Sequence, residues 1–333
     1  MSSSPNVDHV TEQTEPPGDA DAAREALDAV RGEIAKVIVG QDGVVTGLVT
    51  ALLVRGHVLL EGVPGVAKTL LVRTLARSLE LGSTRVQFTP DLMPSDVTGQ
   101  TILEGGEFRF REGPVFTNLL LADEINRTPP RTQSALLEAM QERQVSTGGV
   151  SRPLPEPFLV VATQNPVEHE GTYPLPEAQL DRFLFKLLVP YPSREQERTI
   201  LERHEHGLEH GDPEELGVRP VAGPADLTAA RAAIGHIRVS DEVRGYLVDL
   251  ARATRDAPAV SLGVSPRGAT ALLHAARAWA WLAGRSYVSP DEVKAIAKPT
   301  LRHRLQLRPE LELEGADADS VLDNLLDTVP VPR

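Results

Sequence analysis

The feature that most constrains this chain is a glycine-containing turn between an apolar strand and an amphipathic helix. HVLLEG, residues 57–62, is a short apolar run that ends in glycine, and TLLVRTLARSLEL, residues 69–81, has apolar residues at helical spacing. The turn reads GVPGVAKT and departs from the phosphate-binding pattern Gly, four residues, Gly, Lys, Ser or Thr only at Ala67. The sequence therefore predicts a phosphate-binding loop, with an ordinary strand-turn-helix corner as the alternative.

Each part of this loop has a predicted role. Glycines let the backbone curl so that amide N–H groups point at phosphate oxygens, at the N-terminus of the following helix. We expect Lys68 to reach the β and γ phosphates of a nucleotide and Thr69 to bind Mg²⁺. Ala67 is tolerable if its φ is negative and costly if its φ is positive. The predicted nucleotide-binding residues of the loop are Gly62, Val63, Pro64, Gly65, Val66, Ala67, Lys68, Thr69 and Leu70.

Two carboxylates follow another apolar strand. NLLLAD, residues 118–123, ends in Asp123 and is followed by Glu124, at the carboxyl end of a predicted strand, where open α/β sheets bind ligands. We expect Asp123 to hold hydrated Mg²⁺ and Glu124 to polarise a water for attack on the γ-phosphate. Acidic residues are common at strand ends, but this pair together with the loop favours an Mg²⁺-dependent nucleotide hydrolase.

Further apolar runs predict the rest of the sheet. RVQF (85–88), FLVVAT (158–163) and FLFKLLV (183–189) are typical of buried parallel strands with helices between them. Residues 98–114 and 144–157 alternate polar and apolar residues around glycines, which predicts two inserted hairpins. The expected fold is α/β and doubly wound, with a mostly parallel five-stranded sheet sandwiched by helices.

The chain continues into a helical second domain. Ser240, Ser265 and Ser289 each precede a helical pattern as N-cap residues. Trp279 and Trp281 lie two apart on one of these helices and cannot both face one core, so one is a candidate subunit contact. The predicted units are a disordered acidic tail (1–22), an α/β nucleotide-binding domain (23–192), a linker with one helix (193–228) and a helical lid (229–333).

Charge and cysteine content limit the partners. There are 34 Lys and Arg against 47 Asp and Glu, a net charge of −13, so the overall field repels nucleic acid and anionic membranes. The absence of cysteine excludes disulfides and thiolate metal sites and fits a reducing compartment. The N-terminus lacks the features of a secretory signal, and no apolar run approaches the roughly 20 residues of a membrane span. We expect a cytoplasmic protein without membrane insertion.

Four long stretches resemble the AAA+ ATPases and, within them, the MoxR group. They are EGVPGVAKT, LLLADEINRTPPRTQSALLEAMQERQV, VVATQNPVEHEGTYPLPEAQLDRF and GVSPRG, and the resemblance covers roughly residues 25 to 310. Alanine before the loop lysine is usual in this group. The resemblance implies a P-loop AAA+ core with a C-terminal helical lid, and ATP and Mg²⁺ as cofactors.

The resemblance also implies roles for residues outside the loop. Asn165 matches sensor 1, whose amide can hydrogen-bond the γ-phosphate or the attacking water, although it could simply cap a turn. Arg182 matches the arginine finger, which in ring-shaped relatives reaches the nucleotide of a neighbouring subunit. Arg267 matches sensor 2, from which it can touch the γ-phosphate in its own subunit. Gln41 occupies the position that contacts adenine in relatives.

Two other arginines compete for the finger role. Arg127 and Arg131 lie shortly after the carboxylate pair, and Arg182 could instead be a surface ion-pair partner. The sequence alone leaves these alternatives open.

The function that this resemblance implies is ATP-driven remodelling, assembly or activation of client proteins by a homo-oligomeric ring, most often a hexamer. One alternative is a nucleic-acid motor of the MCM type, for which the first insertion offers Phe108, Arg109, Phe110 and Arg111 beside three glutamates. Another is a scaffold or switch that binds ATP without hydrolysing it; the presence of Glu124 and Arg182 disfavours that alternative. The client protein cannot be identified from the sequence.

Overall fold

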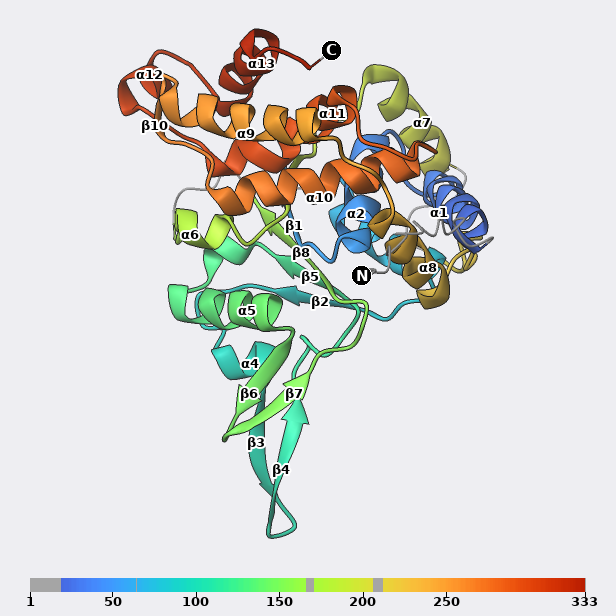
Figure 1. Cartoon of the computed structure of the whole chain (residues 1–333). Coiled ribbons are helices and arrows are strands. Elements are labelled where there is room, and N and C mark those ends of the chain that lie inside the picture. Colours follow the sequence, from blue (N-terminus) through green and yellow to red (C-terminus); the bar gives the residue numbers. More distant parts are fainter. Residues whose placement is uncertain (1–18, 64, 166–170, 206–211, 333) are drawn as a thin grey trace, which may run out of the picture.

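A five-stranded parallel sheet forms the centre of the molecule. The computed structural model describes residues 19–63, 65–165, 171–205 and 212–332 (Figure 1). The strand order is β2-β5-β8-β1-β9, with every neighbouring pair parallel. The bounds are β1 Val58–Glu61, β2 Ser83–Gln87, β5 Leu119–Asp123, β8 Leu159–Gln164 and β9 Phe185–Leu188. All five predicted strands are confirmed, although β2 lies at an edge and is exposed or half-buried rather than covered on both faces.

Each face of the sheet packs against its own helices. Because side chains alternate along a strand, Val58 and Leu60 join the core under α1, α2 and α3, whereas Leu59 joins the core under α4 and α5. Helices therefore cover both faces, as the apolar runs predict. The helices of this domain are α1 (Asp19–Ala35), α2 (Asp42–Leu53), α3 (Lys68–Ser78), α4 (Pro94–Thr98), α5 (Pro130–Glu142) and α6 (Glu177–Leu180).

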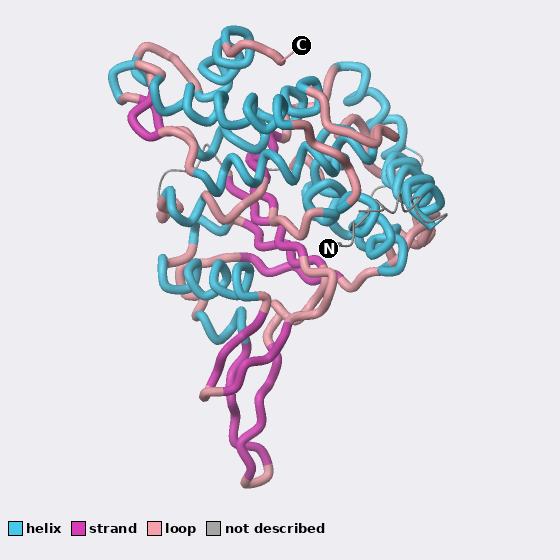
Figure 2. Tube along the Cα trace, viewed as in Figure 1, coloured by secondary structure: helices cyan, strands magenta, loops and turns pink. Residues whose placement is uncertain are grey.

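Both predicted hairpins are present. β3 (Gly99–Glu104) pairs with β4 (Glu107–Glu112), and β6 (Gln144–Thr147) pairs with β7 (Val150–Pro153). The two central residues of each turn are glycines with positive φ, the geometry that two-residue hairpin turns require. Both hairpins project from the same side of the molecule (Figure 2). The guanidinium of Arg152 in the second hairpin lies 4.0 Å from the ring centroid of Phe110 in the first, which links the two.

The lid consists of helices that pack above the sheet. Its main helices are α9 (Asp241–Asp256), α10 (Pro266–Leu282), α11 (Pro290–Leu301) and α13 (Ala318–Thr328). Ser240, Ser265 and Ser289 each accept a hydrogen bond from a first-turn amide of the helix that follows, which confirms the three predicted N-caps. The remaining elements are a short pairing of β10 (Val260–Leu262) with β11 (Gln306–Leu307), the 3₁₀ turn η2 (Arg302–Arg304) and α12 (Pro309–Leu313).

Helix α10 is buried on two sides and joins the lid to the sheet domain. It packs on α9 and α11 in the lid and on α2 and α8 (Pro224–Gly235) below them (Figure 1). For this reason Trp281 is buried and Trp279 is half-buried within the same core. The premise that the two tryptophans cannot face one core was therefore wrong, because a helix between two layers can bury residues on both faces.

Two domain boundaries differ from the sequence prediction. Helix α1 begins at Asp19 and buries Ala20 to 4% exposure, so residues 19–22 belong to the folded domain rather than to the tail. The predicted linker contains α7 (Arg194–Glu205), as expected, but also the start of α8, which packs against α1. The rest of the predicted tail, residues 1–18, lies outside the described residues. Within the described part of the chain, no helix combines the length and apolarity needed to cross a membrane.

A buried histidine ties three elements together at the start of β1. The backbone N–H of Val160 donates to Nδ1 of His57 (3.0 Å), and Nε2 of His57 donates to the carbonyl of Met140 (3.1 Å). These bonds require the neutral ring, and burial lowers the pKa of His57 to about 4.

This pKa predicts an acid-sensitive fold. Below pH 6.5 the unfolded chain protonates this histidine while the folded chain does not, so stability falls as the pH drops from 6.5 to about 4. We expect the free energy of unfolding to fall over this window by up to about 3 kcal/mol more in the wild type than in His57→Asn. Urea unfolding of both proteins at several pH values measures the difference, and parallel pH curves would contradict the assignment.

The turn between β1 and α3 contains a strained alanine. Ala67 has φ +57°, in the left-handed region, so the condition under which alanine would cost little is not met. Gly62, at the start of the same turn, is required for lack of space rather than for its backbone angle. A Cβ on Gly62 would lie 2.6 Å from the carbonyl oxygen of Val189.

We therefore expect Ala67→Gly to stabilise the fold by about 0.5–1 kcal/mol, because glycine adopts positive φ without strain. A matched control is Ala253→Gly in the interior of α9, which should destabilise by about 1 kcal/mol. Chemical denaturation of the three proteins tests this; a loss of stability in Ala67→Gly equal to that of the control would show that the left-handed backbone costs nothing.

Candidate nucleotide-binding site

Three of the predicted catalytic residues, Lys68, Glu124 and Asn165, follow the carboxyl ends of strands in the central sheet. Glu61 at the end of β1 is in register with Gln164 of β8, and Gln87 of β2 is in register with Asp123 of β5. The phosphate-binding loop, the carboxylate pair and Asn165 follow these strand ends, so the parallel sheet brings them to one edge. Pro64 of the loop and residues 166–170 after Asn165 lie outside the described residues.

Lys68 lies at the centre of this edge. Its Nζ donates a 2.5 Å hydrogen bond to the carbonyl of Gly62 in the loop. Burial lowers the pKa of Lys68, and the negative charges of Asp123, Glu124 and Glu61 oppose that shift. The lysine is therefore a cation held among carboxylates, in the position expected of a phosphate ligand.

Asp123 is held on both of its oxygens. Oδ1 accepts a hydrogen bond from the Thr163 hydroxyl (2.6 Å), and Oδ2 accepts one from the Arg85 guanidinium (2.7 Å). The Thr69 hydroxyl makes no hydrogen bond with any other described residue. A hydroxyl and a carboxylate are the hard oxygen donors that Mg²⁺ takes beside phosphate and water, so these residues fit the ion.

Glu124 has a strained backbone and an oriented side chain. Its φ is +56°, and its backbone N–H donates to the Thr163 hydroxyl (2.8 Å). Its Oε2 accepts from Gln87 (2.7 Å) and lies 3.4 Å from the Arg127 guanidinium. Left-handed backbone in a residue other than glycine is uncommon and concentrates at functional sites, which agrees with a catalytic carboxylate here.

The sequence prediction missed three supporting side chains at this edge. Arg85, Gln87 and Thr163 hold the carboxylate pair through the contacts described above. Gln87 ends β2 and Thr163 is the penultimate residue of β8, the two strands that flank β5, so their contacts with the carboxylate pair follow from the strand order rather than from a local sequence pattern.

Gln41 lines a small cavity beside the loop. The cavity has a volume of about 170 Å³, and its walls are mostly apolar. Nε2 of Gln41 donates to the carbonyl of Val66 (2.9 Å), while its buried Oε1 has no partner among the described residues. An apolar slot with one free acceptor fits the flat ring and amino group of adenine. Besides Gln41, the walls include Ile38, Val39, Gly65, Ala67, Leu70, Pro192 and Ile200.

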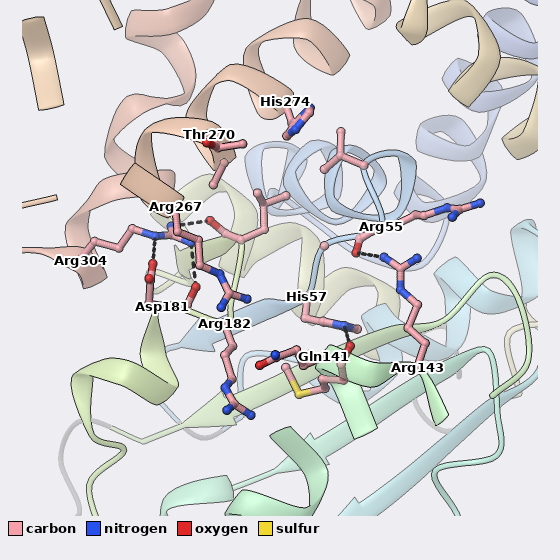
Figure 3. A pocket seen from close by; sticks show the side chains of 15 residues that line it. Arg55, His57, Gln141, Arg143, Asp181, Arg182, Arg267, Thr270, His274 and Arg304 are labelled. Carbon is pink, nitrogen blue, oxygen red and sulfur yellow. Dashed lines mark hydrogen bonds and ion pairs between the residues drawn. The ribbon is translucent and has the colours of Figure 1, made fainter. Parts of the chain in front are cut away.

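Arg182 and Arg267 lie together near the amino ends of the parallel strands, on the side of the sheet opposite to the loop. Arg182 precedes β9, which runs parallel to β1, so it sits near the amino end of that strand, about 13 Å from the loop across the four residues of β1. Both arginines line a pocket of about 420 Å³ that also includes His57 and no loop residue (Figure 3). The expectation that Arg267 touches a nucleotide in its own subunit is therefore not supported by its position.

This second pocket is strongly basic. Arg55, Arg143, Arg182, Arg267 and Arg304 line it, and among the described residues Asp181 is the only carboxylate in its wall. The side chains of Arg182 and Arg267 make no hydrogen bond or ion pair with the other described residues. Two unpaired guanidinium groups in one pocket can receive an anionic group from another molecule.

The two rival finger residues occupy other places. Arg127 lies at the carboxyl edge beside Glu124 of its own chain, and Arg131 is exposed in the first turn of α5. Neither lines the basic pocket.

Comparisons with known proteins find relatives over most of the chain. The model of the ATPase family associated with various cellular activities (AAA) matches residues 57–185, and that of the AAA lid domain matches residues 252–325. The chain is 44% identical to Chaperone MoxR1 of Mycobacterium tuberculosis, over 96% of this chain and 86% of that protein. It is 35% identical to Protein MoxR of Methylorubrum extorquens, over 95% and 98% of the two chains.

Two further relatives carry less functional information. The uncharacterized protein YeaC of Bacillus subtilis is 48% identical over 90% of this chain and 92% of its own. A solved structure of a candidate ATPase from Cytophaga hutchinsonii superimposes with a TM-score of 0.87 at 40% identity, covering 95% of this chain and 97% of that one. The fold, the loop, the lid and these identities together show that the chain belongs to the MoxR group of the AAA+ ATPases.

Proposed function

We propose that this chain hydrolyses ATP at the carboxyl edge of its sheet and that the arginines of an adjacent copy complete the site. The observation that carries this proposal is the separation of the two sets of residues. Lys68, Asp123 and Glu124 share one edge, whereas Arg182 and Arg267 share a pocket at the other. Residues on opposite edges of one sheet cannot meet the same phosphate, but two copies stacked head to tail bring them together.

Within one chain, the loop binds the phosphates and the carboxylates act on Mg²⁺ and on the attacking water. Lys68 binds the terminal phosphates. Thr69 and Asp123 would hold Mg²⁺, which when bound would supply positive charge against the phosphates. Glu124 orients the attacking water and accepts its proton, and Gln87 fixes the direction of the carboxylate. Asn165 contributes its amide to the same edge, and Gln41 contacts the adenine.

The neighbouring copy supplies positive charge. Arg182 acts as the finger that stabilises charge on the γ-phosphate in the transition state, and Arg267 reaches the same nucleotide from the start of α10. A head-to-tail contact that repeats with a closing rotation makes a ring, and we propose six subunits.

The first hairpin is the element that we propose to contact client proteins during remodelling. Leu103 and Phe108 are a cross-strand pair at the end of the first hairpin, 65% and 80% exposed. An apolar pair on a projecting hairpin suits a protein client, and lid movement during hydrolysis would displace it.

A nucleic-acid motor is the less favoured candidate. The first hairpin carries Arg109 and Arg111 against three glutamates, so it does not form the basic groove that tracks a phosphate backbone. Strong, salt-sensitive binding of single-stranded DNA would favour that candidate instead.

Two substitutions should separate nucleotide binding from hydrolysis. Lys68→Ala should abolish binding of ATP, because it removes the cation that faces the phosphates. Glu124→Gln should keep ATP bound but release phosphate at least about 100-fold more slowly, since the amide cannot accept the proton of the water. Fluorescent ATP binding and phosphate release measure the two effects.

A matched control for these variants is Lys294→Ala, which removes a lysine of lid helix α11 outside the assigned loop. Equal ATP affinity in the wild type and in Lys68→Ala would contradict the assigned loop. Unchanged turnover in Glu124→Gln would contradict the role of the carboxylate, and absent turnover in the wild type with ATP bound would favour a nucleotide switch.

A further inference from the structure

A buried arginine of the lid makes several hydrogen bonds to the segment that carries Arg182. Arg304 in η2 is only 8% exposed, and its Nε donates a 2.6 Å hydrogen bond to Oδ1 of Asp181. The same guanidinium donates to the carbonyls of Asp181 (3.2 Å), Phe183 (2.7 Å) and Leu184 (3.0 Å), and also to that of Thr300. A buried guanidinium needs such complete pairing, so this arrangement fixes the backbone on both sides of Arg182.

The two residues before Arg304 also donate hydrogen bonds to this segment. Nε2 of His303 donates to the carbonyl of Phe183 (3.0 Å), and burial holds the pKa of this histidine well below its usual range, so its ring is neutral. Arg302 donates to the carbonyl of Lys186 (3.4 Å) and pairs with Asp319 in α13 (2.8 Å). Three consecutive lid residues therefore hold the chain from Asp181 to Lys186.

Asp181 extends this contact to Arg267. Its second oxygen, Oδ2, accepts a 3.2 Å hydrogen bond from the Ser265 hydroxyl. The Ser265 hydroxyl in turn caps α10 by accepting from the N–H of Gly268 (3.1 Å), and Arg267 is the second residue of that helix. One carboxylate thus connects Arg304, the segment of Arg182 and the helix start that carries Arg267 (Figure 3).

We propose that Asp181 and Arg304 are positioning residues. They keep Arg182 and Arg267 in fixed relative positions, from which both side chains reach the nucleotide of the adjacent copy. This inference rests on the proposed function of those two arginines. The side chains of Arg182 and Arg267 have no partner of their own among the described residues, so their placement depends on the backbone beneath them.

Kinetics give the first test. Arg304→Gln and Asp181→Asn should lower kcat about 10- to 100-fold, because small misplacements of transition-state groups are costly, while the KM for ATP stays within about twofold. The control is Arg244→Gln, an exposed lid arginine that pairs with Asp241 of its own helix, which should leave both constants unchanged. Unchanged kcat in both test variants would overturn the proposal.

A measurement of local order gives the second test and needs no turnover. The chain has no cysteine, so a single cysteine in place of Arg182 accepts one nitroxide label. The electron paramagnetic resonance spectrum should show a more mobile label when Arg304→Gln or Asp181→Asn is added. A second label at Ser95, in α4 away from the lid, should not change.

The two tests together separate the possible failures. If the wild type does not hydrolyse ATP, the proposed function fails, but the label at residue 182 still decides whether Arg304 and Asp181 order that segment. If hydrolysis occurs and the label at 182 stays equally ordered in both variants, the positioning role is wrong. Should Asp181→Asn fail to fold because it leaves the buried Arg304 cation without its carboxylate, Arg304→Gln keeps both tests available, since the Asp181 carboxylate that it leaves is 24% exposed and can be solvated.

Discussion

The parallel direction of the five strands is the constraint on which the rest of this structure depends. It places every βα connection at one edge, so the phosphate-binding loop, the carboxylate pair and Asn165 must meet there. It equally places the segment before β9, with Arg182, at the other edge. Under the proposed function, each chain therefore contributes residues to two different sites, and assembly becomes part of the proposed chemistry.

The lid takes part in the proposed site through buried polar contacts rather than through the nucleotide of its own chain. Helix α10 shares one continuous core with α2 and α8, so lid and sheet domain pack against each other over a broad apolar contact. At the end of that contact, the buried guanidinium of Arg304 donates hydrogen bonds to the carboxylate of Asp181 and to backbone carbonyls. Such a contact is costly to break by removing one partner, which suits the proposed role of holding Arg182 and Arg267 in fixed positions.

Much of this architecture could be predicted from the sequence, because the signals are local. The five apolar runs, the glycine pairs of the hairpins and the three capping serines each act within a few residues, and all appear as expected. The loop and the carboxylates were predicted from their motifs, and their common edge follows from parallel strands. The roles proposed for these residues remain predictions.

What could not be predicted depends on contacts between distant segments. The sign of φ at Ala67 depends on how the loop closes onto α3, and the sequence pattern left both signs open. The place of Arg267 depends on how the lid docks, and Arg304 lies 123 positions from Asp181 along the chain. Gln87 and Arg85 support the carboxylates only because β2 pairs with β5, a pairing that no local pattern specifies.

The most direct measurement mixes two inactive chains. Lys68→Ala keeps both arginines but cannot bind ATP, and the double variant Arg182→Ala, Arg267→Ala binds ATP but lacks the completing charges. If the site is shared between adjacent copies, an equimolar mixture should regain phosphate release, up to about one quarter of the wild-type rate for random arrangement in a ring. A mixture no more active than the sum of its two components, under conditions where the copies exchange, would contradict a site completed by a neighbour.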